Sequence, residues 1–494
     1  MSLFRKKSVS RILAEAESGE LGLKRTLGAA QLIAMGIGAI IGSGLFSLTG
    51  IAAANNAGPA IVWSMVIAAF CCALAGLCYC EFACMIPVAG SAYTYAYSTL
   101  GEWIAWIIGW DLIIEYALGA ATVSISWSSY VVSLLHTFHI DLPARWIAGP
   151  FEGVRLPDQM IMPGYANIPA VLIVGLVSLL LMIGVSESAR VNAVIVVIKV
   201  AVVLVFVGVG YSFINPANYH PFLPPNTGAF GSFGLSGVMM GAGTIFFAYI
   251  GFDAVSTAAQ ECRNPQRDVP IGMIGALIIC TVLYILFAVV ITGMVPYQQL
   301  GVAAPVAIAV DRTPYLWLNH LIKLGIICGF TSVILVMLMG QSRVFYSMSR
   351  DGLVPAAFSQ IHPKFRTPWR SNLLFFFFVA PFSAFLPLSV VGLMTNIGTL
   401  FAFVIVCAAV LVMRRSHPDQ PRPFRTPWVP VIPVLGILAN GALMYSLGRS
   451  NWIRLGVWLL IGQVIYFTYG RRHSKLRKEV NTQPADEPRA LGLR

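Results

Sequence analysis

The sequence predicts an all-α polytopic membrane protein with twelve transmembrane helices. Three observations support this fold class: the composition, the length of the apolar runs and the distribution of basic residues. Hydrophobic residues make up 57% of the 494 residues and charged residues only 11%, whereas about a quarter of the residues of a soluble protein are charged. The composition therefore excludes a soluble protein.

Apolar runs of membrane-spanning length follow one another along the chain. A hydrocarbon core about 30 Å thick needs roughly 20 apolar residues per helix. Twelve runs meet this requirement, and they lie near residues 31–54, 60–86, 103–133, 167–184, 191–213, 236–259, 270–294, 321–348, 371–388, 390–413, 430–447 and 452–470.

Lysine and arginine are concentrated in every second connection between these runs. With the N-terminus inside, the cytoplasmic segments carry 25 basic residues and the opposite loops carry 5. This bias is the positive-inside pattern, which predicts a multi-pass protein of the cell membrane with both termini in the cytoplasm. The basic segments therefore predict contact with anionic membrane lipid and no binding of nucleic acid.

The apolar runs group into two halves that begin alike. Glycine interrupts the first run in residues 36–46 (GIGAIIGSGLF) and the sixth run in residues 241–253 (GAGTIFFAYIGFD), and the breaks are expected at Gly42 and Gly251. Each interrupted run begins a five-helix unit, and the odd number of helices inverts the second unit relative to the first. Such matched interruptions are typical of the binding site of a secondary transporter, although glycine-rich helices also occur where helices simply pack closely. The predicted organisation is a cytoplasmic segment 1–28, a first repeat 29–213, an inverted repeat 236–413, two further helices in 427–470 and a basic cytoplasmic tail 471–494.

The predicted chemistry of the two breaks comes from the backbone. Freed backbone groups cannot face lipid, so they must face a cavity. The freed N–H groups of Ser43 and Gly44 begin a half-helix, which favours a carboxylate. The freed carbonyls around Ile40 and around residues 247–250 can accept hydrogen bonds from an ammonium group. Together these groups match the two charged ends of an α-amino acid.

Lys199 interrupts an apolar run, residues 191–210, that carries no other charge. A lysine at the bilayer centre costs roughly 2.5–3.5 kcal/mol on insertion scales, and it marks an ion or proton path by default. The alternatives are that Lys199 reaches an interface or pairs with a carboxylate for packing. Its position halfway along the run argues against the first alternative, because this reach needs a nearby interface.

Four motifs in order resemble those of one family. They are residues 36–50 (GIGAIIGSGLFSLTG), 78–119 (CYCEFACMIPVAGSAYTYAYSTLGEWIAWIIGWDLIIEYALG), 246–272 (FFAYIGFDAVSTAAQECRNPQRDVPIG) and 342–355 (SRVFYSMSRDGLVP). The chain is similar to the amino acid–polyamine–organocation superfamily, in particular to the branch of the cationic amino acid transporters. The resemblance covers about residues 22–415.

The resemblance implies a LeuT-type fold, a five-plus-five inverted repeat with broken helices 1 and 6. It implies that Lys199 takes the place of a sodium ion, and hence proton coupling. It assigns the substrate carboxylate to Ser43 and Gly44. It assigns the substrate amine to Ile40, Phe247, Ala248 and Ile250.

Two residues bear on substrate size and charge. Vertebrate cationic members of the family carry a Gly-Ser pair where this chain has Val336 and Met337. Met337 fills space that a long basic side chain needs, which favours small neutral amino acids such as alanine. Glu115 favours the opposite, since it could pair with the side chain of arginine or lysine, but it could equally be a structural carboxyl within the bundle.

Three further acidic residues are expected to have structural roles. Glu81 and Asp111 are expected near the membrane interfaces, where they would anchor loops. Asp253 is expected to cap the second half of the sixth helix.

The predicted function is that of a secondary active transporter, a proton symporter that imports L-amino acids by alternating access. The expected partners are an L-amino acid, a proton and membrane lipid. Whether a small membrane protein also binds is left open by the sequence. No cofactor, metal or catalytic residue is expected, since GxxxxGK[ST] and HExxH are absent from the sequence. An amino-acid exchanger or an amino-acid sensor on the same fold is the alternative.

Overall fold

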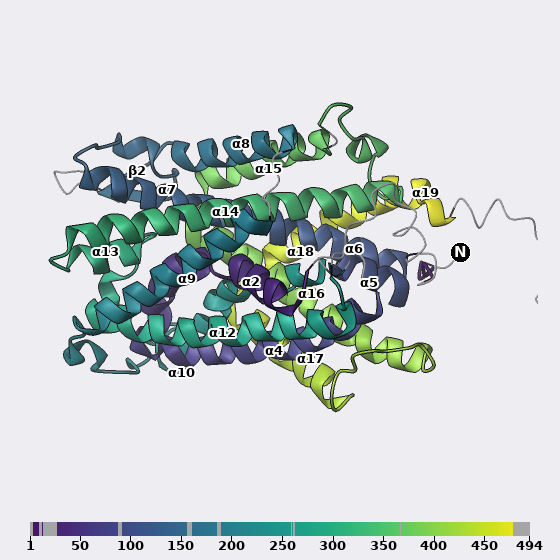
Figure 1. The fold of residues 1–494 in the computed structure, drawn as a ribbon, viewed down its shortest axis with the longest axis horizontal. Helices are drawn as coiled ribbons and strands as arrows, with labels where there is room; N and C mark the ends of the chain where they lie inside the picture. The colour runs from purple at the N-terminus through teal and green to yellow at the C-terminus, as the bar shows by residue number, and fades with distance from the viewer. Residues whose placement is uncertain are drawn as a thin grey trace, which may run out of the picture.

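In the computed structural model the chain is built almost entirely of helices, most of which run along one common direction (Figure 1). The structure describes residues 3–8, 12, 27–86, 91–155, 161–184, 189–257, 259, 262–365 and 367–477. Two three-residue strands, β1 (Gly153–Arg155) and β2 (Ile161–Pro163), pair antiparallel in the connection before α8.

The helices of the first half include two with irregular turns in their interior. A π-helical turn η1 (Gly44–Leu48) follows α2, and another, η4 (Ile114–Leu118), joins α6 to α7. The α-helices are α2 (Ala29–Ile40), α3 (Thr49–Ala52), α4 (Ile61–Met85), α5 (Ser91–Thr99), α6 (Glu102–Ile113), α7 (Gly119–Thr137), α8 (Ile168–Ile183) and α9 (Ala189–Tyr211). The short turns are η2 (Ala53–Ala57), η3 (Gly58–Ala60), η5 (Ala144–Trp146) and η6 (Pro216–Tyr219).

The second half of the chain is helical as well. The α-helices are α10 (Gly234–Ile245), α11 (Ala254–Thr257), α12 (Pro265–Met294), α13 (Pro305–Asp311), α14 (Leu316–Arg350), α15 (Trp369–Phe385), α16 (Leu388–Ser416), α17 (Val431–Ser446), α18 (Arg449–Ile465) and α19 (Arg471–His473). The short turns are η7 (Phe246–Tyr249), η9 (Tyr297–Gln299), η10 (Ala356–Ser359) and η11 (Tyr466–Gly470).

Eight helical stretches of the described residues are long and apolar enough to cross a membrane, and three shorter apolar helices accompany them. The three shorter helices are α2, α8 and α17. The chain is therefore a polytopic helical membrane protein, as predicted, while the exact number of crossings stays a prediction.

Helix α8 illustrates how local sequence sets the helix ends. The side chain of Asn167 accepts a hydrogen bond from the backbone N–H of Ala170 at 3.2 Å, which satisfies one of the donors left free in the first turn. Gly184 ends the helix with φ +85°, a left-handed conformation that favours glycine. Between these two residues the sequence is apolar except for Ser178, which is buried.

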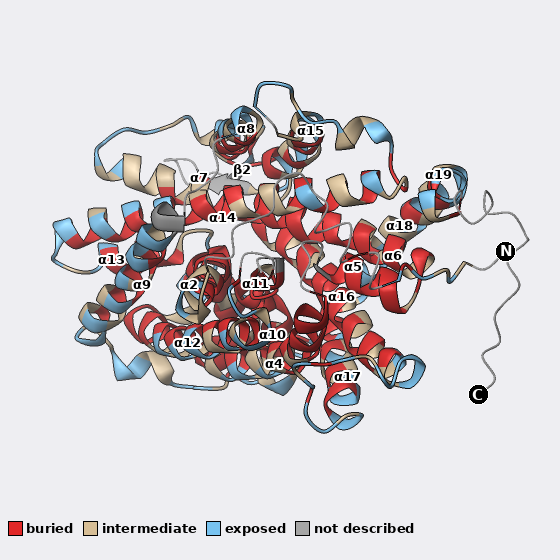
Figure 2. Ribbon diagram, turned by 45° about the vertical axis from the view of Figure 1, so that its right-hand side comes forward, coloured by how far each residue is buried: buried red, intermediate tan, exposed pale blue. Residues whose placement is uncertain are grey.

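The buried residues gather in the middle of the bundle (Figure 2). There α12 packs against α4, α2 and α9, while α14 packs against α7 and α9, and α16 against α17. The outward faces of α8, α9, α17 and α18 instead expose large apolar side chains, such as Leu172, Val197, Leu438 and Leu460. An exposed apolar surface of this extent needs lipid around it.

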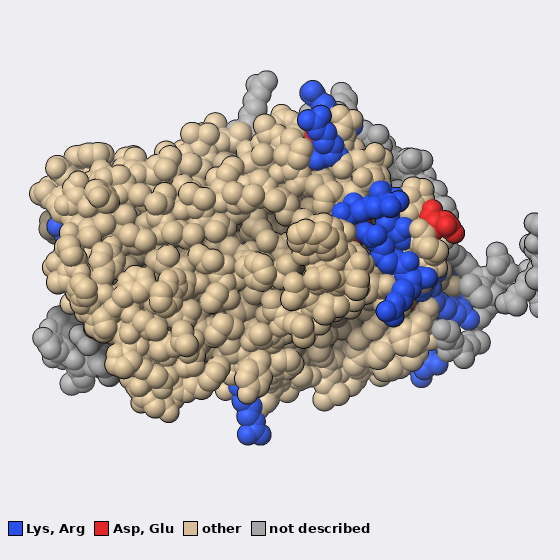
Figure 3. Space-filling view, turned by 90° about the horizontal axis from the view of Figure 1, so that it is seen from below, with Lys and Arg blue, Asp and Glu red and all other residues tan. Residues whose placement is uncertain are grey.

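Charged side chains gather at one end of the molecule. Seen from below, lysine and arginine cluster at the end where Figure 1 places the N-terminus and α19, and most of the remaining face is uncharged (Figure 3). We call this end the basic end. It is also the end at which the first and last described segments of the chain lie.

The N-terminal segment, residues 3–7, is bound to the basic end. The carbonyl of Arg5 accepts from the N–H of Glu102 at 2.8 Å, and the carbonyl of Leu3 accepts from Trp103 at 3.3 Å. These donors belong to the first turn of α6, whose preceding residue Gly101 has no side chain to cap them. Gly101 has φ +99°, and a Cβ atom there would lie 2.6 Å from the backbone of Phe4, so glycine is required.

The same segment links the two halves of the chain. The ammonium of Lys7 lies 2.9 Å from one carboxylate oxygen of Asp351, directly after α14, and the hydroxyl of Tyr93 in α5 donates to the other oxygen at 2.7 Å. The C-terminal segment meets the same residue, since the N–H of Lys475 donates to the carbonyl of Asp351 at 3.0 Å.

Glu102 receives a partner from the end of the described chain. Its carboxylate is fully buried, and it accepts from Arg477 at 2.7 Å and from the hydroxyl of Tyr466 at 2.8 Å. Ser474 also donates to it. The first and the last described segments of the chain are therefore structural parts of the basic end.

Candidate functional site

The first apolar run is interrupted within the bundle. Helix α2 ends at Ile40, and helical structure resumes at Gly44. The carbonyl of Gly42 accepts from the N–H groups of Leu45 and Phe46, both at 3.2 Å, so a new helical segment begins there. The hydroxyl of Ser43 is fully buried and has no hydrogen-bond partner among the described residues.

The sixth apolar run is interrupted at a comparable place. Helix α10 ends at Ile245, the tight turn η7 follows, and α11 begins only at Ala254. The N–H of Ile250 donates to the carbonyl of Phe247 at 3.2 Å, so this carbonyl is not free. Gly251 has φ +111°, a conformation that side chains rarely adopt.

The two interruptions touch each other. A Cβ atom at Gly44 would lie 2.2 Å from the Cα of Ala248, so only glycine allows this approach. A Cβ atom at Gly251 would likewise lie 2.9 Å from the carbonyl oxygen of Ala39. At Gly42 the nearest atom would be 3.5 Å away, which is ordinary contact. The predicted residues Ile40, Ser43, Gly44, Phe247, Ala248 and Ile250 are therefore brought into one buried region.

Tyr284 of α12 joins the two interruptions. Its hydroxyl lies 3.0 Å from the carbonyl oxygen of Ile40 and 2.9 Å from that of Ala248. Sequence reasoning missed this residue, because a single tyrosine in an apolar helix has no periodic signal. The only available signal was a hydroxyl in the middle of an aliphatic membrane-spanning run.

Asn396 of α16 likewise donates hydrogen bonds to backbone carbonyls at the end of α10. Its amide lies 2.8 Å from the carbonyl oxygens of both Gly243 and Thr244, in a fully buried position. These carbonyls belong to the last turn of α10, which has no continuing helix to satisfy them. The sequence did not single out this residue either.

Lys199 of α9 points to the first interrupted run. Its ammonium donates to the carbonyl of Gly38 at 2.6 Å, and the side chain is 1% exposed. Its methylene groups lie against α14, where a Cβ atom at Gly329 would be 3.1 Å from them. Lys199 therefore joins α2 to α14 within the bundle. Its ammonium is buried and does not reach a membrane interface.

Met337 and Glu115 belong to two helical segments, α14 and η4, that pack against each other. Met337 is buried in α14, and its sulfur would lie 3.5 Å from a Cβ atom at Gly119, just after η4. Glu115 lies in η4 and is 1% exposed, and Thr399 of α16 hydrogen-bonds to it. One of its carboxyl oxygens has no partner among the described residues.

The three acidic residues of expected structural role differ in outcome. Asp111 was expected at an interface with a loop, and this is wrong: its carboxyl group is buried, and an oxygen lies 3.1 Å from where a Cβ atom of Gly398 would be. Neither of its oxygens has a partner among the described residues. Asp253 precedes α11, and the backbone of Ala254, the first residue of that helix, hydrogen-bonds to it. A capping side chain accepts from the second or third residue of a helix, so the cap role of Asp253 stays a prediction.

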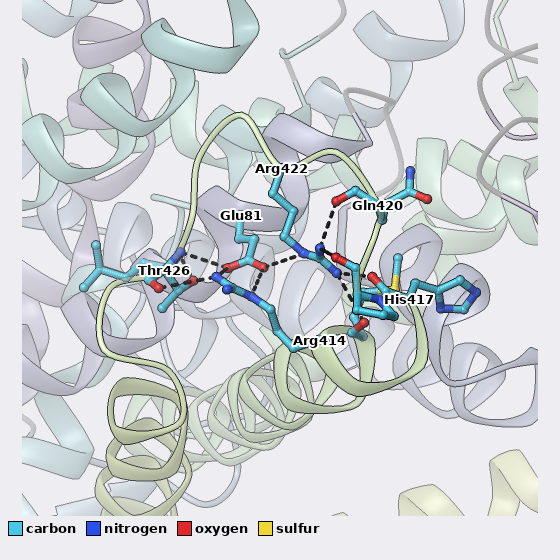
Figure 4. A network of polar contacts seen from close by, with 9 residues as sticks. Glu81, Arg414, His417, Gln420, Arg422 and Thr426 are labelled. Atoms are coloured by element: carbon cyan, nitrogen blue, oxygen red, sulfur yellow. Dashed lines mark hydrogen bonds and ion pairs between the residues drawn. The ribbon is translucent and has the colours of Figure 1, made fainter.

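Glu81 does anchor a loop (Figure 4). Two nitrogens of Arg414 donate to its two oxygens at 2.8 and 2.9 Å, and Arg422 lies 3.4 Å from one of them. The N–H of Thr426 donates to the carboxylate at 2.8 Å. Glu81 in α4 thereby holds the end of α16 and the connection to α17.

The family of this chain follows from comparison with known proteins. The model of the amino acid permease family matches residues 27–464. The chain therefore belongs to this family of the amino acid–polyamine–organocation superfamily, whose members are transporters and not enzymes.

Individual relatives cover nearly the whole chain. The branched-chain amino acid permease BcaP of Bacillus subtilis is 46% identical over 97% of this chain and 99% of its own length. The methylthioribose transporter of Bacillus subtilis is 42% identical over 97% and 100% of the two chains. The vacuolar cationic amino acid transporter 4 of Arabidopsis thaliana is 30% identical over 97% of each chain.

Proposed function

We propose that the protein is a secondary active transporter that takes up L-amino acids together with protons by alternating access. The observation that carries this proposal is the contact between two interrupted helices. The carbonyl oxygens of Ile40 and Ala248 both lie within 3.0 Å of the hydroxyl oxygen of Tyr284. The proposed architecture is twelve helices with a LeuT-type inverted repeat, residues 29–213 and 236–413. The membership in the amino acid permease family supports it.

The proposed binding mode uses both charged ends of the substrate. The start of the half-helix at Ser43 and Gly44 offers N–H groups to the carboxylate. The carbonyls of Ile40 and Ala248, with the backbone of Phe247 and Ile250 beside them, offer acceptors to the ammonium. Met337 and Glu115 would then border the space for the substrate side chain.

The proposed coupling residue is Lys199. Charged, it holds the carbonyl of Gly38 in α2; neutral, it keeps at most a weaker hydrogen bond there. Loss of the proton would therefore loosen α2 from α9 and α14. Release of α2 would allow the substrate to leave on the inner side.

A sugar-like substrate is the second candidate, because a relative of 42% identity is named a methylthioribose transporter. The test is uptake into proteoliposomes, with alanine, leucine, arginine and methylthioribose as labelled substrates. We expect saturable, gradient-driven uptake of amino acids. Uptake of methylthioribose alone would overturn the proposal, uptake that needs an internal amino acid would indicate an exchanger, and binding without counterflow would indicate a sensor.

Substitution of Met337 by serine is expected to widen the range of substrates. Serine frees the volume of a buried methionine side chain, so larger and basic amino acids should compete with alanine roughly 10-fold better or more. Competition by leucine and arginine against labelled alanine measures the effect. Met348→Ser is the matched control, since Met348 is buried in the same helix but lies beside Gly109 of α6. An unchanged competition profile for Met337→Ser would show that Met337 does not line the pocket.

The basic end is proposed to face the cytoplasm. A cysteine introduced in the tail after Arg472 is then expected to resist an impermeant thiol reagent in intact cells and to react after the membrane is opened. Cys328, the exposed cysteine of the described residues, is first replaced by serine. Thr227→Cys, in an exposed connection at the opposite end, should react in intact cells. Labelling of the tail cysteine from outside would reverse the proposed orientation.

A further inference from the structure

The connection between α16 and α17, residues 417–430, is fixed to α4 by the ion pairs of Glu81 (Figure 4). The N–H of Thr426 donates to the Glu81 carboxylate at 2.8 Å, and the hydroxyl of Thr426 donates to the carbonyl of Leu77 at 3.1 Å. Arg422 donates to backbone carbonyls of the connection itself. The backbone from which the exposed side chains of this connection project is therefore held in one place.

Positive charge exceeds negative charge here, because Arg414 and Arg422 share the single carboxylate of Glu81. Arg425 adds a third guanidinium group and Asp419 adds one further carboxylate, and both of these side chains are exposed. Burial lowers the pKa of the Arg422 guanidinium, and Glu81 opposes this effect. The charges of Arg414 and Arg425 lower the pKa as well, so the three cations lie close enough to repel one another. An additional anion at this place would relieve the repulsion.

Trp428 projects from the connection shortly after these arginines. Its side chain is 78% exposed, and its φ of +44° is a left-handed conformation that large side chains rarely adopt. The conformation is held from both sides, since the carbonyl of Trp428 accepts from the N–H of Val431 at 2.6 Å while Thr426 is bound to α4. Strained backbone of this kind gathers at functional places. An apolar ring with a polar N–H suits the boundary between membrane and water, where tryptophan is enriched.

An apolar stripe on α17 continues from this tryptophan. Helix α17 begins at Val431, directly after the connection. Exposed apolar residues recur along it at spacings of three and four residues, so they share one face of the helix: Val431, Val434, Leu435 and Leu438. Cations at the end of an exposed apolar helix face match the form of a phospholipid, which has an anionic phosphate and long acyl chains.

We propose that the connection between α16 and α17 binds the headgroup of an anionic phospholipid. The guanidinium of Arg425 donates to the phosphate, because its planar fork matches the phosphate oxygens. Trp428 lies where the headgroup meets the acyl chains, and an acyl chain covers the exposed face of α17. The phosphate offsets the positive charge that Glu81 leaves uncompensated, so the bound lipid stabilises this part of the bundle. A zwitterionic lipid binds less well, since the same cations repel its ammonium group.

The test is thermal unfolding of the purified full-length protein in detergent with added phosphatidylglycerol or phosphatidylcholine of the same acyl chains. We expect phosphatidylglycerol to raise the unfolding temperature of the wild type in a saturable way, and phosphatidylcholine to raise it much less. Arg425→Gln should need roughly 10-fold more phosphatidylglycerol for half of the effect, because a charge-assisted hydrogen bond is lost. Arg425→Lys keeps the charge without the planar fork and should lie between the two.

Arg350→Gln is the matched control. Arg350 is also exposed at the basic end, but it ends α14 and precedes Asp351, to which Lys7 of the N-terminal segment is bound. This variant removes the same charge from the same end of the molecule and should leave the phosphatidylglycerol dependence unchanged. Inorganic phosphate at the same concentration is the second control, since it carries the anion without acyl chains. It should stabilise the wild type little.

Three results would overturn the proposal. Equal stabilisation by the two lipids, or an equal loss of the effect in Arg425→Gln and Arg350→Gln, would mean that this connection holds no anionic lipid. Stabilisation by inorganic phosphate as large as that by phosphatidylglycerol, and lost in Arg425→Gln, would assign the cations to a soluble phosphate compound. If Arg425→Gln is not recovered folded, Trp428→Ala takes its place, and an unchanged phosphatidylglycerol dependence in that variant would overturn the site.

Discussion

Replacement of Lys199 by methionine is expected to abolish amino-acid uptake driven by an inward proton gradient. Methionine is similar in length and fits the buried position, but it can neither bind a proton nor donate to the carbonyl of Gly38. Accumulation into proteoliposomes with an imposed pH gradient should fall to the level of protein-free liposomes. Substrate binding, measured as thermal stabilisation in detergent, should persist because the proposed binding groups are backbone groups of the two helix interruptions.

Lys323→Met is the matched control for this prediction. Lys323 is also buried in a long helix, but its ammonium is paired with Asp311 at 3.0 Å and lies 3.2 Å from the hydroxyl of Thr137. Its loss should affect stability and leave gradient-driven uptake per folded molecule in place. Gradient-driven accumulation by Lys199→Met at the wild-type level would refute the coupling role. A strict sodium requirement in the wild type would refute it equally.

Glu81→Ala is expected to cause the largest loss of stability. The carboxylate is almost fully buried and has two arginine partners. Removal of one partner from a buried ion pair costs about 3–5 kcal/mol, since the remaining charge is left unpaired. Arg422 makes this loss severe, because it is buried itself and burial lowers the pKa of its guanidinium, an effect that Glu81 opposes. Thermal unfolding in detergent, followed by size-exclusion recovery after heating, measures the loss.

Two variants calibrate the effect of Glu81→Ala. Glu81→Gln keeps the shape and one acceptor oxygen, so its stability should fall between those of the wild type and Glu81→Ala. Asp419→Ala removes an exposed carboxylate from the same connection and should have little effect. Equal unfolding temperatures for Glu81→Ala and Asp419→Ala would mean that this ion-pair network does not stabilise the fold.

The interruptions of the first and sixth apolar runs could be predicted from the sequence, because glycine is a local signal. The approach of Gly44 to Ala248 explains why a side chain is excluded there. A charge in an apolar run is equally visible, so Lys199 could be singled out, although its partner Gly38 could not. Whether these residues bind substrate and protons stays a prediction.

The parts of the site that could not be predicted are side chains that serve the backbone of another helix. Tyr284 and Asn396 satisfy carbonyls that lie 36 residues away or more along the chain. Such pairings have no spacing rule within one helix. Asp111 shows the same limit. Its position in the first third of the predicted run 103–133 does not indicate that α16 buries its carboxyl group.

The first and last described segments meet at the basic end, and this has a consequence for biosynthesis. Glu102 is made early, yet its arginine partner lies 375 residues later, and Asp351 meets a lysine made 344 residues before it. Chains grow from the N-terminus at about 5–20 residues per second, so Glu102 has to wait for tens of seconds before Arg477 leaves the ribosome. During that interval α7 to α18 are synthesised while this surface is incomplete. The bundle therefore reaches its final form only after translation of the last described residues, and a nascent chain that stops short of Arg477 lacks the cation that Glu102 needs.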